Sequence, residues 1–299
     1  MNVLYIIMII KHLVISGGGP TMVNSLGSIH HLIEENVIDI DKIESVYGTS
    51  AGAIVCVLFC LKFDIETIYD YIIKRPWHNI FTINVRDIFD AYTKKGIFDI
   101  KTFEKCFKPL FDAKDLPLEI TLEEFYNYSK IELHVFSFEI NDFKMEDISY
   151  LTHPTLPLLH ALLMTCSLPV LVTPMCINNK CYTDGGVVCN YPLKYCIESG
   201  KKENEILGIK NQYDENNTNR LDSESNLLDF IINFLFKAIY SLSIDNEQPI
   251  INNEIICKTQ IISIKEFKIS LSSIEKRIEL YQKGIESSKV FLSKLKNCC

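Results

Sequence analysis

A serine between two glycines is the first candidate for chemistry in the sequence. Gly48 and Gly52 lie two positions either side of Ser50, in the pattern G-x-S-x-G. Residues 43–47 are predicted to form a strand, and residues 51–61 are apolar on nearly every side, as in a buried helix. A strand that runs directly into a helix forces a tight turn and lifts the serine hydroxyl out of the sheet. The pattern therefore predicts that Ser50 is a nucleophile, with a chance match as the alternative.

A run of three glycines is the second candidate. Gly17, Gly18 and Gly19 follow a short apolar segment, residues 12–16, and precede apolar residues at helical spacing. Glycine lets the backbone approach a ligand closely, so these amides could donate to the oxyanion of an acyl-transfer reaction. A phosphate loop is the alternative, but neither the Walker A pattern nor the dinucleotide-binding fingerprint is met.

An aspartate is the candidate for the base that accepts the serine proton. Asp184 precedes Gly185 and Gly186 at the end of a predicted strand. A carboxylate held within hydrogen-bond reach in a partly desolvated site can act alone as a general base. Taken by itself, an Asp-Gly pair is more often a hairpin turn. It is predicted to be catalytic only together with Ser50 and the glycine triplet.

Histidines offer a different base. The usual α/β-hydrolase order places an acid and then a histidine after the serine, but no histidine follows Asp184. His153 and His160 could serve a triad of another order. Each is more often a helix-end or packing residue, and we favour the aspartate.

The elements around these residues alternate between strand and helix, which predicts an α/β fold with a mostly parallel central sheet and helices on both faces. Residues 176–192 alternate around Asn-Asn and Asp-Gly-Gly like paired strands and a loop. Further strands are predicted at 12–16, 43–47, 133–138 and 255–264, and helices at 51–61, 160–168, 227–244 and 272–296.

Two segments have no predicted chemistry. Residues 64–128 are rich in aromatic side chains and could form a lid or side wall over a pocket. Residues 210–226 are polar and poor in apolar side chains, so we expect a solvated loop.

One catalytic domain is expected over residues 8–299. Its motif-bearing core covers about 11–200, and about 201–299 add C-terminal helices and a strand. Residues 1–7 are an apolar extension, which is too short to span a membrane and lacks a signal-peptide cleavage site. Met8 is an alternative start.

The composition argues against several classes of protein. The 47% hydrophobic and 23% charged residues are ordinary for a globular protein, and the net charge of -8 without a basic patch argues against nucleic-acid binding. Eleven cysteines include no C-x-x-C pair, so we expect free, mostly buried thiols in a reducing, cytoplasmic compartment rather than a disulfide framework. Cys298 and Cys299 could be a lipidation site or free cysteines at a frayed end.

Three motifs in order resemble the patatin-like phospholipase family: SGGGP at 16–20, GTSAG at 48–52 and TDGGVVCNYP at 183–192. HALLMTCSLPVLVTP at 160–174 and LYQKGIESSKVFLSKL at 280–295 are similar to further segments of that family. The resemblance implies a three-layer architecture and a lipid acyl hydrolase that needs no metal or other cofactor. It also implies phospholipid or another lipid ester as substrate, with transient contact to a membrane surface.

The resemblance implies roles for the candidate residues: Ser50 as nucleophile, Asp184 as base and Gly17 to Gly19 as oxyanion hole. One departure concerns the residues after the glycine triplet, where the family commonly has a basic residue and a further glycine, and this chain has Thr21 and Met22. Because of this departure, an inactive lipid-binding or partner-binding protein is an alternative. A non-lipid serine esterase is a second alternative, because a Ser-Asp dyad does not fix the substrate.

Overall fold

The computed structural model describes residues 9–213, 221–245, 249–260 and 264–297. The predicted extension at 1–7, the alternative start at Met8 and the terminal pair Cys298 and Cys299 lie outside these ranges. No helix in the described ranges is both long enough and apolar enough to cross a bilayer.

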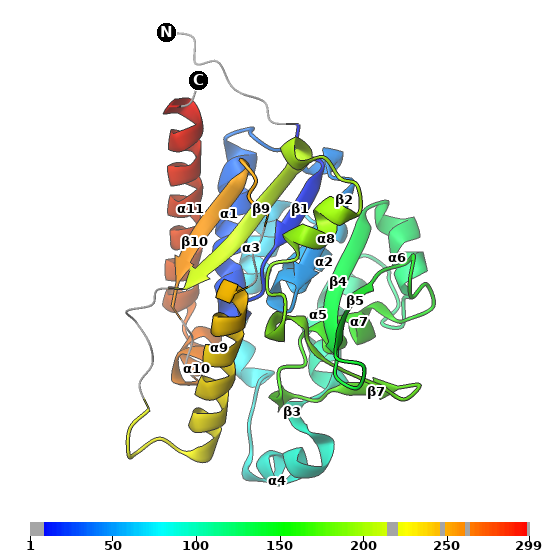
Figure 1. Cartoon of the computed structure of the whole chain (residues 1–299), viewed down its shortest axis with the longest axis vertical. Coiled ribbons are helices and arrows are strands. Elements are labelled where there is room, and N and C mark those ends of the chain that lie inside the picture. The colour runs from blue at the N-terminus through cyan, green and yellow to red at the C-terminus, as the bar shows by residue number, and fades with distance from the viewer. Residues whose placement is uncertain (1–8, 214–220, 246–248, 261–263, 298–299) are drawn as a thin grey trace.

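A central sheet of eight strands organises the fold, with the strand order β10-β9-β1-β2-β4-β8-β7 and β5 paired to β4 (Figure 1). Strands β10, β9, β1, β2 and β4 are parallel, and β8 is antiparallel to β4. This confirms the predicted α/β fold with a mostly parallel sheet. The strands are β1 (His12–Ile15), β2 (Ser45–Thr49), β4 (Glu132–Glu139), β5 (Lys144–Ile148), β7 (Met175–Ile177), β8 (Lys180–Asp184), β9 (Ile206–Tyr213) and β10 (Glu254–Thr259), with a separate pair β3 (Gly96–Phe98) and β6 (Val170–Val172).

Helices cover both faces of the sheet because neighbouring side chains of its strands point to opposite sides. In β2, Val46 packs into the larger core, whereas Tyr47 packs into a smaller core with Leu193 of α8. The larger core is covered mainly by α1, α2, α3, α5, α7 and α11. The helices are α1 (Met22–Glu34), α2 (Ala51–Cys60), α3 (Ile65–Lys74), α4 (Val85–Lys94), α5 (Ile100–Asp112), α6 (Leu122–Ser129), α7 (Leu158–Thr165), α8 (Leu193–Glu198), α9 (Leu227–Asp245), α10 (Ile264–Ser272) and α11 (Ile274–Asn297).

The prediction of a solvated loop at 210–226 is wrong for its first four residues. Residues 210–213 complete β9, which pairs with β1 on one side and β10 on the other (Figure 1). The apolar residues Ile206, Leu207 and Ile209 are buried and fix this strand in the sheet. Polar residues follow them in the strand because it ends beside the candidate site, where Asn211 bonds Gly17. Residues 214–220 of the predicted loop lie outside the described ranges.

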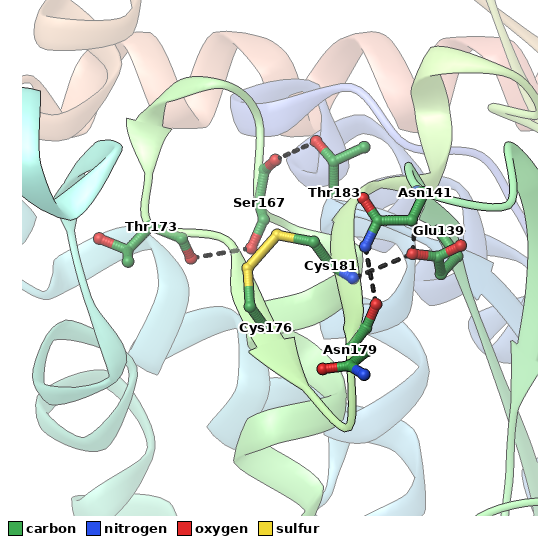
Figure 2. The surroundings of a disulfide bond; sticks show 8 residues. All are labelled: Glu139, Asn141, Ser167, Thr173, Cys176, Asn179, Cys181 and Thr183. Carbon is green, nitrogen blue, oxygen red and sulfur yellow. Dashed lines mark hydrogen bonds between the residues drawn. A yellow bond between two sulfur atoms is a disulfide. The ribbon is translucent and has the colours of Figure 1, made fainter.

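The cysteines are free and mostly buried with one exception among the described residues. Cys176 of β7 and Cys181 of β8 form a disulfide, as Figure 2 shows. The expectation of free thiols is therefore wrong for this pair. The physical reason is the tight turn at Asn178 and Asn179, both with positive φ, which sets the two cysteines directly opposite one another in the hairpin.

A buried arginine ties together the ends of two helices. Arg277 of α11 is buried, and its guanidinium donates five hydrogen bonds of 2.7–3.1 Å to backbone carbonyls. The carbonyls lie near the carboxyl ends of α3 and α10, where the last turn of a helix leaves acceptors unpaired. They belong to Ile73, Arg75, Ser270 and Leu271.

Replacing this arginine is expected to destabilise the protein. Arg277→Met keeps an unbranched side chain but removes all five hydrogen bonds, and of the four carbonyls the one of Arg75 keeps a bond from the amide of Trp77. The free energy of unfolding should therefore fall by about 3 kcal/mol or more. Urea denaturation measures this change. Lys283→Met on the same helix, where the lysine is exposed, should change the free energy by less than about 0.5 kcal/mol. Equal stability of the two variants would contradict the role given to Arg277.

Candidate active site

Ser50 lies in a sharp turn between β2 and α2. Its backbone has φ 53° and ψ -129°, a conformation that side-chain-bearing residues rarely adopt. The flanking glycines let the turn pack closely: a Cβ at Gly52 would lie 2.3 Å from the carbonyl oxygen of Ile15, and one at Gly48 would lie 2.6 Å from the amide nitrogen of Ala53. These positions therefore exclude any larger residue unless the backbone moves.

Asp184 lies at the end of β8 and faces the serine. Ser50 Oγ donates a hydrogen bond to Asp184 Oδ2 at 2.6 Å, and the amide of Gly186 donates to Asp184 Oδ1 at 2.7 Å. Gly185 lies against β4, where an added Cβ would be 2.3 Å from the carbonyl oxygen of Phe136. The sheet thus brings together two residues that are 134 positions apart in the sequence.

Burial changes the acidity of this aspartate. Removal from water raises the pKa of Asp184 to about 6, while the hydrogen bonds from Ser50 and Gly186 act in the opposite direction. A carboxyl with this pKa is mostly ionised at neutral pH and is a better proton acceptor than a solvated aspartate.

Thr165 fixes the serine from the other side. The amide of Ser50 donates to Thr165 Oγ1 at 2.8 Å, and this hydroxyl in turn donates to the carbonyl of Phe136. Thr165 ends α7, so a helix and β4 jointly hold the turn. The sequence reasoning did not single out Thr165, although it lies within the segment 160–174 that resembles the family.

The glycine triplet forms a loop beside Ser50. Gly17 is held in place by Asn190: its amide donates to the Asn190 carbonyl at 3.0 Å, and its carbonyl accepts from Asn190 Nδ2 at 3.2 Å. Gly18 and Gly19 have φ values of 156° and 56°, which glycine adopts without a steric penalty. Neither of their amides donates to an acceptor within the described residues.

Asn211 of β9 supports the same loop. Its side-chain amide donates to the carbonyl of Gly17 at 2.9 Å and to Thr21 Oγ1 at 3.0 Å, and Thr21 Oγ1 donates to the carbonyl of Gly18 at 2.9 Å. Thr21, which stands where the family commonly has a basic residue, therefore braces the loop. Asn211 was missed because the sequence reasoning placed it in a solvated loop. The buried apolar run before it, at the carboxyl end of a parallel strand, was the available signal.

A cavity of about 740 Å³ contains Ser50 and Asp184. Residues from segment 64–128 form much of its wall, which confirms the predicted side wall. The wall is mostly apolar, with side chains that include Ile54, Leu58, Phe81, Phe103, Phe107 and Leu171. The cavity suits a long hydrocarbon chain that ends at the serine.

The two histidines considered for a triad do not reach the serine. His153 hydrogen-bonds Thr152 and lies near Glu146, and neither His153 nor His160 bonds Ser50 or Asp184. Burial lowers the pKa of both histidines. Of the candidate bases, the structure brings only Asp184 within hydrogen-bond distance of Ser50.

Several known proteins are similar to this chain. "Probable lipid hydrolase 463L" of Invertebrate iridescent virus 6 is 29% identical over 197 residues, which cover 65% of this chain and 66% of that protein. "Uncharacterized protein R571" of Acanthamoeba polyphaga mimivirus is 24% identical in an alignment of 300 positions, which covers 96% of this chain and 95% of that protein. The fold is similar to that of VipD from Legionella pneumophila, with a TM-score of 0.57 and 18% identity over 96% of this chain and 67% of VipD.

The model of one protein family matches more than half of the chain. It covers residues 13–197, from β1 into α8, and includes the glycine loop, the serine turn and the aspartate. Its description is patatin-like phospholipase. The chain therefore belongs to the patatin-like phospholipase family.

Proposed function

We propose that this protein is a lipid acyl hydrolase of the phospholipase A type, which cleaves fatty-acyl esters through an acyl-enzyme on Ser50. The observation that carries the proposal is the 2.6 Å hydrogen bond between Ser50 and Asp184 inside an apolar cavity. The volume of about 740 Å³ is in the usual range for small-molecule sites, and the apolar wall favours an acyl chain.

In the first half of the reaction, Ser50 Oγ attacks the carbonyl carbon of the ester while Asp184 accepts the hydroxyl proton. The resulting tetrahedral oxyanion collapses and the bond to the alcohol oxygen breaks. The proton held by Asp184 passes to that oxygen, and the lysophospholipid leaves. The acyl group remains as an ester on Ser50.

In the second half, water attacks the acyl-serine carbonyl and gives its proton to Asp184. Collapse of this second intermediate releases the fatty acid and returns the proton to Ser50 Oγ. The same carboxylate thus serves as acceptor and then donor twice in each cycle, which suits a pKa of about 6.

The glycine loop is proposed to stabilise both oxyanions. The amides of Gly18 and Gly19 are the donors we assign, because the amide of Gly17 is already bonded to Asn190. Gly17 instead anchors the loop through its amide and its carbonyl. Donors that are fixed before the reaction stabilise charge without reorganisation during it.

Vesicle hydrolysis and serine labelling together test this proposal. Purified protein is expected to release fatty acid and lysophospholipid from mixed phospholipid vesicles, with both products identified by mass spectrometry. A fluorophosphonate is expected to add to Ser50, located by the mass of its peptide, and to block that release.

Two other results would favour the alternatives. Vesicle binding with neither labelling nor release would indicate an inactive lipid-binding protein. Labelling of Ser50 together with cleavage of short-chain esters but not of phospholipids would indicate a non-lipid serine esterase. Either result would overturn the proposed function.

A further inference from the structure

Helix α4 carries an apolar face that nothing covers within the described part of the chain. Val85, Ile88, Phe89 and Tyr92 recur at helical spacing and therefore share one face. Their side chains are 55–94% exposed, and α4 has no buried residue. The apolar face of a helix in a globular protein ordinarily packs against the core. On α4 it is directed to solvent.

Helix α9 presents a second apolar face. Leu227, Phe230 and Phe234 are spaced at i, i+3 and i+7 and are 55–75% exposed, whereas Ile232 of the same helix is buried. One side of α9 is therefore packed into the protein, and the other exposes three large apolar side chains, which is unusual for a globular domain. Together the seven exposed side chains of α4 and α9 are named the entrance surface: Val85, Ile88, Phe89, Tyr92, Leu227, Phe230 and Phe234.

Both helices border the cavity that contains Ser50. Ile88 of α4 and Leu227 of α9 line this cavity and are also largely exposed, so the cavity wall reaches the molecular surface at both helices. Figure 1 shows α4 and the start of α9 at the same end of the molecule, away from both labelled chain termini. An acyl chain that enters at this point therefore passes the exposed apolar side chains first.

The charge near α4 differs from that of the whole chain. Residues 70–112 contain eight lysines and arginines and six aspartates and glutamates, a net charge of +2 in a chain of net charge -8, and Lys74 and Lys108 pair with Asp70 and Asp112. On and just after α4, Arg86 and Lys95 are exposed and form no ion pair with any residue that the structure describes. Apolar side chains next to unpaired cations complement a bilayer with anionic headgroups.

We propose that the entrance surface docks on an anionic lipid bilayer and positions the cavity mouth over its substrate, an inference that rests on the proposed lipid hydrolysis. A second copy of this chain fits the surface less well. A contact between two copies across these side chains would cover the place where the cavity meets solvent, whereas a bilayer brings lipid substrate to it.

Vesicle flotation tests the docking surface without interference from hydrolysis. The background is Ser50→Ala, and the vesicles contain phosphatidylcholine alone or with phosphatidylserine. Phe89→Ser with Tyr92→Ser, and separately Phe230→Ser with Phe234→Ser, remove exposed side chains that do not line the cavity. Each pair is expected to lower vesicle binding at least tenfold, and binding should be stronger with phosphatidylserine and weaker at high salt.

A matched control uses apolar side chains at the opposite edge of the sheet. Ile9 and Ile250 are 62% and 89% exposed and precede β1 and β10, so they lie at the amino ends of these strands. Ile9→Ser with Ile250→Ser should leave vesicle binding unchanged. All pairs should keep the melting temperature of the parent, because each replaced side chain is exposed.

The catalytic background separates the docking surface from the proposed function. With Ser50 restored, the Phe89 and Tyr92 variant should lose vesicle hydrolysis but keep cleavage of 4-nitrophenyl butyrate, which needs no bilayer. A parent without any esterase activity would overturn the proposed function, while flotation would still test docking. Two results would overturn the docking proposal. One is unchanged vesicle binding in both double variants of the entrance surface; the other is a parent dimer that dissociates in these variants.

Discussion

Ser50→Ala is expected to lower fatty-acid release from phospholipid vesicles on the order of 10⁴-fold or more. The substitution removes the atom that would form the acyl-enzyme and that donates a hydrogen bond to Asp184. Alanine fits the turn as well as serine does, because both carry a Cβ at the same positive φ. The loss should therefore come from the chemistry and not from a change in fold.

A second buried serine provides the matched control for this substitution. Ser25 of α1 is buried, and its hydroxyl has no hydrogen-bond partner within the described residues. Ser25→Ala removes the same atom outside the cavity and should leave the rate of release within about twofold of the parent. Retention of release in Ser50→Ala, with a melting curve like that of Ser25→Ala, would show that another group is the nucleophile.

Asp184→Asn is expected to lower the rate of hydrolysis by about 10²- to 10⁴-fold. Asparagine can still accept the hydrogen bond from Gly186 and can hold Ser50 with its NH₂ group, but it cannot accept the serine proton. In the parent, release should rise with pH around a midpoint of about 6, because only the ionised carboxylate is a base. This midpoint should be absent from the residual activity of the variant.

The same substitution should raise stability while it lowers activity. Burial raises the pKa of Asp184 from 3.8 to about 6 in the folded protein, so folding disfavours the ionised form. The cost is absent below pH 3.8, grows as the pH rises to about 6 and is complete above it. At pH 8, the free energy of unfolding of Asp184→Asn should therefore exceed that of the parent by up to about 3 kcal/mol. Urea denaturation would show this as a higher midpoint concentration. Near-normal turnover in this variant, with cooperative unfolding that shows it is folded, would refute the base assignment.

The candidate site could be predicted from the sequence where its geometry is local. Gly48, Ser50 and Gly52 are within five residues, and the strand and helix that make the turn lie on either side of them. The Asp184 motif is similarly compact. The tight strand-to-helix turn requires small residues on both sides of the serine, and these residues are adjacent in the sequence. The turn can therefore be predicted without knowledge of distant contacts.

The supports of the site were not predictable in the same way. Asn211 donates a hydrogen bond to the carbonyl of Gly17 from β9, a strand that is distant from Gly17 in the sequence. Thr165 of α7 accepts the hydrogen bond from the amide of Ser50. Both hydrogen bonds depend on tertiary pairing, which a single sequence does not display. The disulfide was missed for a different reason: paired strands around Asn178 and Asn179 were predicted, but the irregular cysteine spacing was taken to favour free thiols, and the register that sets Cys176 opposite Cys181 was not considered.

The spacing of hydrophobic residues predicts that a helix is amphipathic but not whether its apolar side is buried. The apolar positions of α4 repeat at the same interval as those of α1, yet the α1 residues Leu26 and Ile29 are buried and the α4 residues Phe89 and Tyr92 are exposed. Periodicity shows that a helix has two unlike sides. Which surface each side meets is decided by the rest of the fold.

The position of β9 has a consequence for the order in which the molecule can be assembled. Strand β1 is paired with β9 along its whole length, from His12 opposite Ile206 to Ile15 opposite Ile209. On the ribosome, β1 emerges long before this partner, so one of its edges stays unpaired and its glycine loop lacks the brace from Asn211. Pairings between such distant segments form late in folding. A growing chain would therefore remain without its proposed oxyanion loop until the second half of the sheet had been synthesised, and lipid hydrolysis could begin only after that.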